Sequence, residues 1–183
     1  MILENIQKSF KISKNCISWK VYNARWVLER AIRDHAMQID KERVKSASLQ
    51  LKTFLQYIQN AESKEQLRGY EGEAASIYFS VFDELILQQK KDFSFHGRSK
   101  RPPMDNVNAM LSFVYTLLTN QITSALDGVG LDPCVGYLHT ERPGRASLAL
   151  ELIEEFRAIY ADRFVLSLIN KKIVNKKNFT KKE

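Results

Sequence analysis

Residues 106–126 read NVNAMLSFVYTLLTNQITSAL and contain no glycine, proline or charged residue. Apolar side chains recur along this stretch at spacings of three and four, as at Val107, Met110 and Val114, which is the period of a helix with one buried face. Asp105 stands directly before it, where a side-chain oxygen can accept a hydrogen bond from an otherwise unpaired backbone amide. The sequence therefore predicts a helix over residues 106–126.

A helical hairpin is predicted near the start of the chain. Residues 17–39 carry large apolar side chains at helical spacings, namely Trp19, Tyr22, Trp26, Leu28 and Ile32. Asp40 then suits the N-cap of a second helix over residues 44–59. Because so few residues separate the two segments, we expect them to pack against each other as a hairpin.

A third helical segment follows the hairpin and contains two glycines. Ser63 and Gln66 have the spacing of a capping box, which opens a segment that continues to residue 89. Gly69 and Gly72 lie within it, and we expect them to bend the helix and to let other backbone or a ligand approach closely.

The last predicted helix covers residues 148–170 and is opened by Ser147 or a neighbour. Residues 128–144 before it are predicted to form a loop. Only 7 glycines and 4 prolines occur in the chain, and they leave long segments of helical rather than alternating periodicity. The predicted fold class is all-α, with several helices.

The size and composition indicate a soluble protein with a real core. A chain of 183 residues, 44% of them hydrophobic, can bury an interior without disulfides or a structural metal. Cys16 and Cys134 lie far apart, so a disulfide framework is not expected and a reducing, cytoplasmic setting fits. We find neither a secretion signal nor an apolar segment long enough to span a membrane.

Basic residues concentrate in two segments, 90–103 and 171–183, while the formal net charge of the whole chain is +7. This favours a polyanionic partner, above all nucleic acid, although the Lys-rich tail can equally be an ordinary solvated end. In the internal segment, Phe93 and Phe95 alternate with the cations; they either stack on bases or pin the segment onto the core. The candidate DNA-contacting residues there are Lys90, Lys91, Arg98, Lys100 and Arg101.

Three positions stand out as candidates for chemistry. His139 ends the apolar segment 135–138 just before a turn and a helix, which would hold its side chain rigidly. Glu151 and Glu154 are three residues apart on one helix face, where two like charges require compensation. Arg157 or a divalent metal held by carboxylate and imidazole could supply it. Glu71, between the two glycines, is either a solvated residue or a site carboxylate.

Five motifs in order resemble the CRISPR-associated endonuclease and integrase family, the first CRISPR-associated protein, and most closely its type I-C members. The motifs read RGYEGEAASIYF (68–79), RPPMDNVNAMLSF (101–113), GLDP (130–133), GYLH (136–139) and GRASLALELIEEFR (144–157). The match spans roughly residues 17–170. The resemblance implies a helical catalytic domain over 17–170, with residues 1–16 as a lead-in and 171–183 as a Lys-rich tail.

The resemblance also implies the site. The family's metal ligands fall on Glu71, His139 and Glu154, and the donor set favours Mn²⁺ or Mg²⁺. Glu151, where relatives usually carry aspartate, is expected to support the site. Asn108 and Arg145 are expected either to support the site or to contact DNA. The implied activity is metal-dependent cleavage and integration of DNA in CRISPR spacer acquisition.

The implied partners are double-stranded and branched DNA, the second CRISPR-associated protein, and, for the full-length family, a second copy of the chain. Family members begin with a β-rich domain that forms the homodimer, and we expect this sequence to be a fragment that lacks it. Two other readings stay open at this point. One is an inactive helical DNA-binding or assembly module, and the other is a helical bundle without a DNA role.

Overall fold

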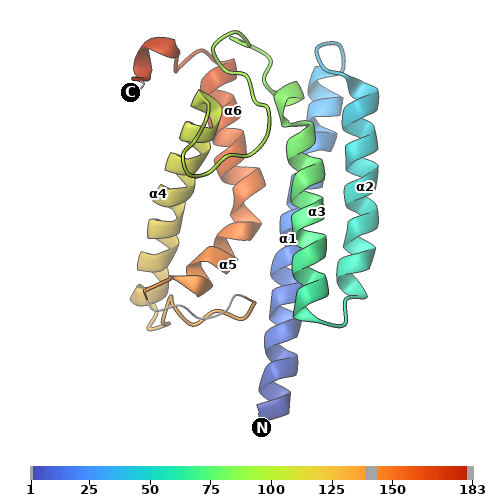
Figure 1. The fold of residues 1–183 in the computed structure, drawn as a ribbon, viewed down its shortest axis with the longest axis vertical. Helices are drawn as coiled ribbons and strands as arrows, with labels where there is room; N and C mark the ends of the chain where they lie inside the picture. Colours follow the sequence, from blue (N-terminus) through green and yellow to red (C-terminus); the bar gives the residue numbers. More distant parts are fainter. Residues whose placement is uncertain (1, 139–143, 181–183) are drawn as a thin grey trace.

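The computed structural model describes residues 2–138 and 144–180, and within these ranges it is helical with no β-strand, so the all-α prediction is confirmed (Figure 1). The described α-helices are α1 (Ile2–His35), α2 (Lys41–Gln59), α3 (Lys64–Ser80), α4 (Asn106–Gly128), α5 (Ser147–Phe156) and α6 (Arg163–Asn170). Two 3₁₀ turns, η1 (Phe82–Leu85) and η3 (Lys176–Asn178), and the π-helical segment η2 (Arg157–Asp162) complete them.

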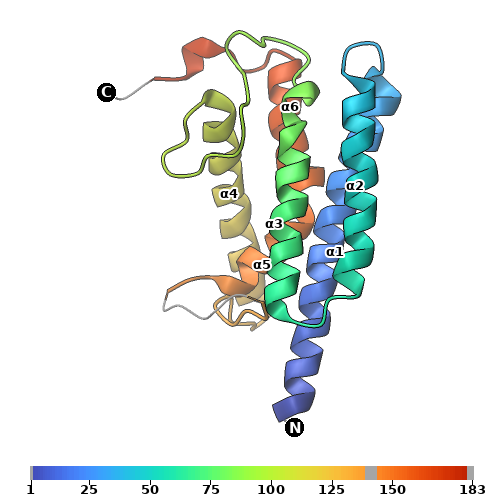
Figure 2. The same cartoon turned by 45° about the vertical axis from the view of Figure 1, so that its right-hand side comes forward.

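Helix α1 is the centre of the arrangement. It packs against α2 and α3 on one side, and against α5 and η2 on the other. Figures 1 and 2 show α1, α2 and α3 as one group, with α4 and the α5–α6 segment beside it. The predicted hairpin of the first two helices is therefore confirmed, and one hydrophobic core joins the two groups, as at Leu28, Leu111 and Ile153.

Several predicted helix ends were wrong. The first helix begins at Ile2 rather than near residue 17 and ends at His35, so the proposed division at residue 16 coincides with no helix boundary. The third ends at Ser80 and is followed by η1, so it does not reach residue 89. Residues 147–170 are helical as predicted, but η2 interrupts the α-helical hydrogen bonding between α5 and α6.

The glycines of α3 do not break the helix, which continues unbroken through them (Figure 2). A Cβ built on Gly69 or Gly72 would meet no atom within 4 Å, so other backbone does not approach closely there, contrary to our expectation. Gly72 instead faces a cavity, which leaves the approach of a ligand as the remaining alternative.

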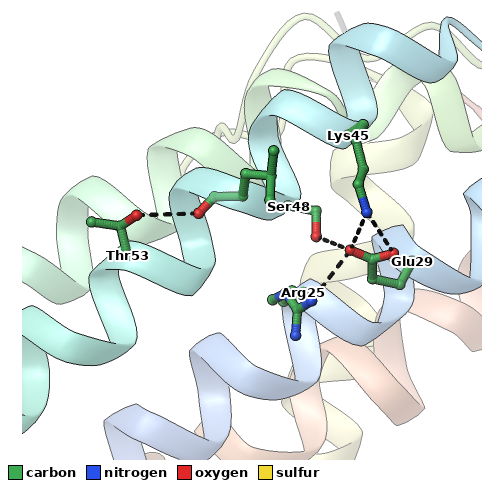
Figure 3. Close-up of polar contacts among 6 residues, drawn as sticks. Arg25, Glu29, Lys45, Ser48 and Thr53 are labelled. Carbon is green, nitrogen blue, oxygen red and sulfur yellow. Dashed lines mark hydrogen bonds and ion pairs between the residues drawn. The ribbon is translucent and has the colours of Figure 1, made fainter.

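A partly buried polar cluster joins α1 to α2 (Figure 3). The carboxylate of Glu29 accepts a hydrogen bond from Ser48 Oγ at 2.6 Å and pairs with Lys45 Nζ at 3.2 Å and Arg25 Nη2 at 3.4 Å. These contacts, led by the hydrogen bond from Ser48, lower the pKa of Glu29. The cluster satisfies a carboxylate inside the hairpin and lies apart from the cavity lining described below.

The basic segment between η1 and α4 is anchored by its aromatic residues. Phe93 is 0% exposed and Phe95 is 4% exposed, and both belong to the main core. The ring centroid of Phe95 lies 4.9 Å from that of Phe82. Of the two alternatives, pinning onto the core is the one observed, and neither ring is available to stack on a base.

Among the described helices, none combines the length and apolar composition needed to cross a membrane.

Three N-caps predicted from sequence are present, and one of them gives a simple stability test. The capping box predicted at Ser63 is only half formed, because the side chain of Gln66 accepts from the amide of Glu62 rather than from that of Ser63. Asp40, Ser63 and Asp105 accept from the backbone amides of Arg43, Gln66 and Asn108, respectively. We expect Ser63→Ala to lower the free energy of unfolding by about 1 kcal/mol, because the amide of Gln66 loses its partner. Urea denaturation measures this, with Ser46→Ala on the exposed face of α2 as the control; equal stabilities of the two variants would contradict it.

Candidate active site

A cavity of about 930 Å³ opens between the two groups of helices. Helices α1, α3, α4, α5 and η2 contribute to its walls, together with residues 95–100 of the basic segment. More basic than acidic side chains line it. The charged residues that line it include Lys20, Arg68, Glu71, Arg98, Lys100, Arg145, Glu154 and Arg157.

Glu71 and Glu154, predicted from different motifs, meet at a single cation. The ammonium Nζ of Lys20 lies 2.5 Å from Glu71 Oε1 and 2.7 Å from Glu154 Oε2. Lys20 comes from α1, Glu71 from α3 and Glu154 from α5, so three helices must pack correctly to form the group. Burial opposes the charge of Lys20, but Glu154 and Glu71 raise its pKa above the ordinary value and keep it protonated.

Arg157 compensates Glu154 as the helical spacing predicted. Its Nη1 lies 2.8 Å from Glu154 Oε1, one turn away at the start of η2. The guanidinium of Arg157 also lies over the ring of Tyr115 at 5.0 Å, and that of Arg98 lies over the same ring at 5.3 Å. A π-helical turn often occurs at a functional site because it re-aims side chains, and here it begins with a cation beside a site carboxylate.

Glu151 has a different role from its neighbour Glu154. It is 3% exposed, and its two carboxylate oxygens accept from the backbone amides of Tyr137 at 2.8 Å and Leu138 at 2.7 Å. It therefore fixes the segment that leads directly to position 139. His139 itself lies outside the described residues, so its predicted place as a ligand stays a prediction. The supporting role predicted for Glu151 stays a prediction, and these two contacts are the observation that bears on it.

Other residues fix the same segment from two further helices. Ser9 on α1 donates from Oγ to the carbonyl of Tyr137 at 3.1 Å, and Lys64 and Arg68 on α3 donate to the carbonyls of Tyr137 and Leu138. Gly136 is required for the close packing here. A Cβ on it would lie 2.7 Å from Ser147 Cβ and 2.8 Å from Glu151 Oε1.

Asn108 organises the basic segment against the start of α4. Fully buried, it donates from Nδ2 to Gly97 O at 2.8 Å and accepts at Oδ1 from Arg98 Nη1 at 2.8 Å and Ser99 N at 3.0 Å. Asp105 accepts from the Nδ2 of Asn108 at 2.6 Å. Asn108 thus fixes the position of Arg98 in the cavity lining, while its own side chain is fully buried.

The candidate DNA-contacting residues fall into two sets. Arg98 and Lys100 line the cavity, and Arg145 lines it from the side that precedes α5. Burial, followed by the nearby Arg157 and Arg98 charges, lowers the pKa of Lys100. The other three are exposed and lie outside the cavity lining; they are Lys90, Lys91 and Arg101.

A buried carboxylate behind Tyr115 makes stability depend on pH. Asp162 accepts a hydrogen bond from Tyr115 Oη at 2.5 Å, and burial raises the pKa of Asp162 from 3.8 to about 6. The folded chain therefore binds a proton more readily than the unfolded chain. The contribution of Asp162 to stability is largest below the unfolded pKa and is lost as pH rises through about 6.

We accordingly expect Asp162→Asn to change stability in a pH-dependent way. Asparagine can still accept from Tyr115, but it carries no charge to desolvate. Relative to wild type, the variant should gain about 3 kcal/mol of unfolding free energy between about pH 4 and about pH 8. Urea denaturation of both proteins across this range measures the difference; a difference that does not change with pH would contradict the assignment.

Carboxylate oxygens are ligands that Mg²⁺ and Mn²⁺ prefer, and Glu71 and Glu154 bring one oxygen each to a single cation. Within residues 2–138 and 144–180 no third His, Cys, Asp or Glu completes a metal-binding group with them.

Sequence reasoning missed Lys20 and Arg68 as site residues. Arg68 stood in a quoted motif, but nothing in the pattern around Lys20 distinguishes it from a solvated helix lysine.

Comparison with known proteins gives consistent matches. The family model for "CRISPR associated protein Cas1" matches residues 1–183. A CRISPR-associated endonuclease Cas1 of Chlorobaculum tepidum is 49% identical over 96% of this chain and 51% of its own length. The CRISPR-associated endonuclease Cas1 of Leptospira interrogans is 46% identical over 94% of this chain and 67% of its own length. The chain thus spans about half to two thirds of these relatives.

Solved structures agree with the sequence matches. A Cas1 protein from Thermotoga maritima superposes with a TM-score of 0.80 at 28% identity, over 97% of this chain and 52% of its own. A casposase bound to integration product superposes with a TM-score of 0.82 at 30% identity, over 98% of this chain and 48% of its own. With the family model matched along the whole sequence and the same helical fold in these structures, the chain belongs to the Cas1 family of CRISPR-associated proteins.

Proposed function

We propose that this chain carries the catalytic domain of a metal-dependent DNA endonuclease and integrase that acts in CRISPR spacer acquisition. The observation that carries the proposal is the convergence of Glu71 and Glu154 on one cation, inside a cavity lined by arginine and lysine. Carboxylates that hold a metal and cations that hold phosphates are the two requirements of phosphodiester chemistry. The names of the relatives and the casposase neighbour support the same activity.

Glu71, Glu154 and His139 would hold Mn²⁺ or Mg²⁺. When bound, such an ion lowers the pKa of an attacking hydroxyl and neutralises charge that develops on the phosphate. The reaction is an in-line displacement: a 3′-hydroxyl or water forms a bond to phosphorus, and the bond to the leaving oxygen breaks. Glu151 positions the segment before His139 through the amides of Tyr137 and Leu138.

The basic residues bind the DNA in this proposal. Arg98, Lys100, Arg145 and Arg157 line the cavity and would contact the phosphates nearest the reacting bond. Lys90, Lys91 and Arg101 lie outside it and would hold the backbone further along, with little sequence preference and a strong dependence on salt.

We extend the proposal to partners by resemblance to the family. They are double-stranded and branched DNA, the second CRISPR-associated protein and, for the full-length protein, a homodimer. The setting is the prokaryotic cytoplasm.

The competing function is a helical DNA-binding or assembly module without activity. The two differ in a cleavage assay with labelled branched DNA, in Mn²⁺ and in EDTA. We expect salt-dependent binding in both conditions and cleavage or strand joining only with Mn²⁺, accompanied by a rise in thermal stability equivalent to about 2.7 kcal/mol at a hundredfold excess over Kd. Binding without any metal-dependent reaction or stabilisation would favour the module.

A further inference from the structure

Lys20 occupies the position between the two site carboxylates. Its ammonium contacts one oxygen of Glu71 and one oxygen of Glu154, at 2.5 and 2.7 Å. The three side chains are largely shielded from water, at 16%, 18% and 6% exposure for Lys20, Glu71 and Glu154. Water therefore screens little of the repulsion that the two carboxylates would otherwise exert on each other.

No other described cation replaces Lys20 in this role. Arg157 pairs with Glu154 through the other carboxylate oxygen, Oε1, and reaches only that carboxylate. Among residues 2–138 and 144–180, Glu71 forms an ion pair with Lys20 alone. Within the part of the chain that the structure describes, the ammonium group of Lys20 thus links Glu71 on α3 to Glu154 on α5.

A divalent cation bound by the same two oxygens would compete with this ammonium for one position. Two cations this close repel each other, so occupancy by one disfavours the other. A lysine side chain can move out of this position, because its four-carbon stem is flexible and its ammonium is a compact charge that can be hydrated in an open cavity. The cavity of about 930 Å³ beside it provides that space.

We propose that Lys20 is a built-in counter-ion of the metal site: it holds Glu71 and Glu154 together in the metal-free protein and is exchanged for the divalent cation on binding. This rests on the proposed function, since it requires that Glu71 and Glu154 bind the metal. It makes Lys20 a positioning residue that keeps the empty site assembled and sets how tightly the ion binds.

The test is Mn²⁺ binding by isothermal titration calorimetry, with thermal unfolding in EDTA as a second readout. Lys20→Met keeps the aliphatic stem and removes the competing charge. We expect it to bind Mn²⁺ at least about tenfold more tightly than wild type, and to unfold at a lower temperature in EDTA with a larger rise on adding Mn²⁺. Lys45→Met, which removes a cation paired with Glu29 outside the cavity, is the matched control and should bind Mn²⁺ as wild type does.

The outcomes separate this inference from the proposed function. Suppose that Lys20→Met binds Mn²⁺ no more tightly than wild type, while adding Glu154→Gln abolishes binding in both of these proteins. The proposed exchange of Lys20 for the metal is then wrong, and the metal site stands. If Glu154→Gln does not change Mn²⁺ binding in either protein, the proposed metal site itself is wrong. Should Lys20→Met fail to fold, Lys20→Gln serves in its place, because a neutral amide also removes the charge and must also tighten binding.

Discussion

Glu154→Gln should reduce Mn²⁺-dependent DNA cleavage and strand joining by at least about a thousandfold, equivalent to about 4 kcal/mol of transition-state stabilisation. Glutamine keeps the size of the side chain but offers a weaker, uncharged donor to the ion. Glu71→Gln should have the same effect, because both carboxylates meet at one cation. Single-turnover rates with labelled branched DNA measure the loss.

DNA affinity in EDTA distinguishes a chemical defect from a folding defect in these variants. We expect it to remain near the wild-type value, because the arginines and lysines of the cavity are unchanged. The matched control is Glu73→Gln, two residues from Glu71 on an exposed face of α3, which should leave the rate unchanged. Retention of full activity in Glu71→Gln or Glu154→Gln would remove the basis of the proposed metal site.

Glu151→Ala should lower both stability and activity. Two backbone amides, part-buried at Tyr137 and buried at Leu138, would lose their acceptor, at a cost of about 3 kcal/mol in unfolding free energy. The segment that positions His139 would be released, and residues that orient a metal ligand are typically worth about 10–100-fold in activity or metal affinity. Urea denaturation and the Mn²⁺ Kd measure the two effects.

Glu151→Asp provides the graded control for this prediction. Its shorter side chain still carries a carboxylate, so we expect a loss between wild type and alanine in both measurements. Stability lost without any change in Mn²⁺ affinity would mean that Glu151 supports the fold alone. Equal Mn²⁺ affinity in all three proteins would therefore disprove its role at the site.

Local signals in the sequence predicted the caps that open α2, α3 and α4. Asp40 and Asp105 cap helices because each needs only a backbone amide two or three residues away. The early start of α1 was missed because residues 2–16 lack the aromatic spacing seen later in that helix. The π-helical η2 was missed for a different reason: its extra residue is set by packing between α5, α1 and α4, and that packing is not encoded in local periodicity.

The candidate site was predictable where chemistry repeats at helical spacing. The pairing of Glu154 with Arg157 follows from their separation of three residues, and the structure contains it. The meeting of Lys20 with Glu71 depends instead on how α1 and α3 pack, across fifty-one residues of sequence. Phe93 and Phe95 could not be assigned from composition, because the same rings suit a base stack and a core, and burial decides between them.

Helix α1 sets the spacing of three contacts around the candidate site. Along its length, Ser9 contacts Tyr137, Lys20 contacts both carboxylates, and Asn23 contacts the carbonyl of Glu155. One residue inserted between Ser9 and Lys20 would rotate all later residues of α1 about the helix axis by about 100° and shift them along it by about 1.5 Å. The side chains on the solvent face of α1 do not enter these contacts, whereas a change in the number of residues between Ser9, Lys20 and Asn23 would displace the contacts relative to one another.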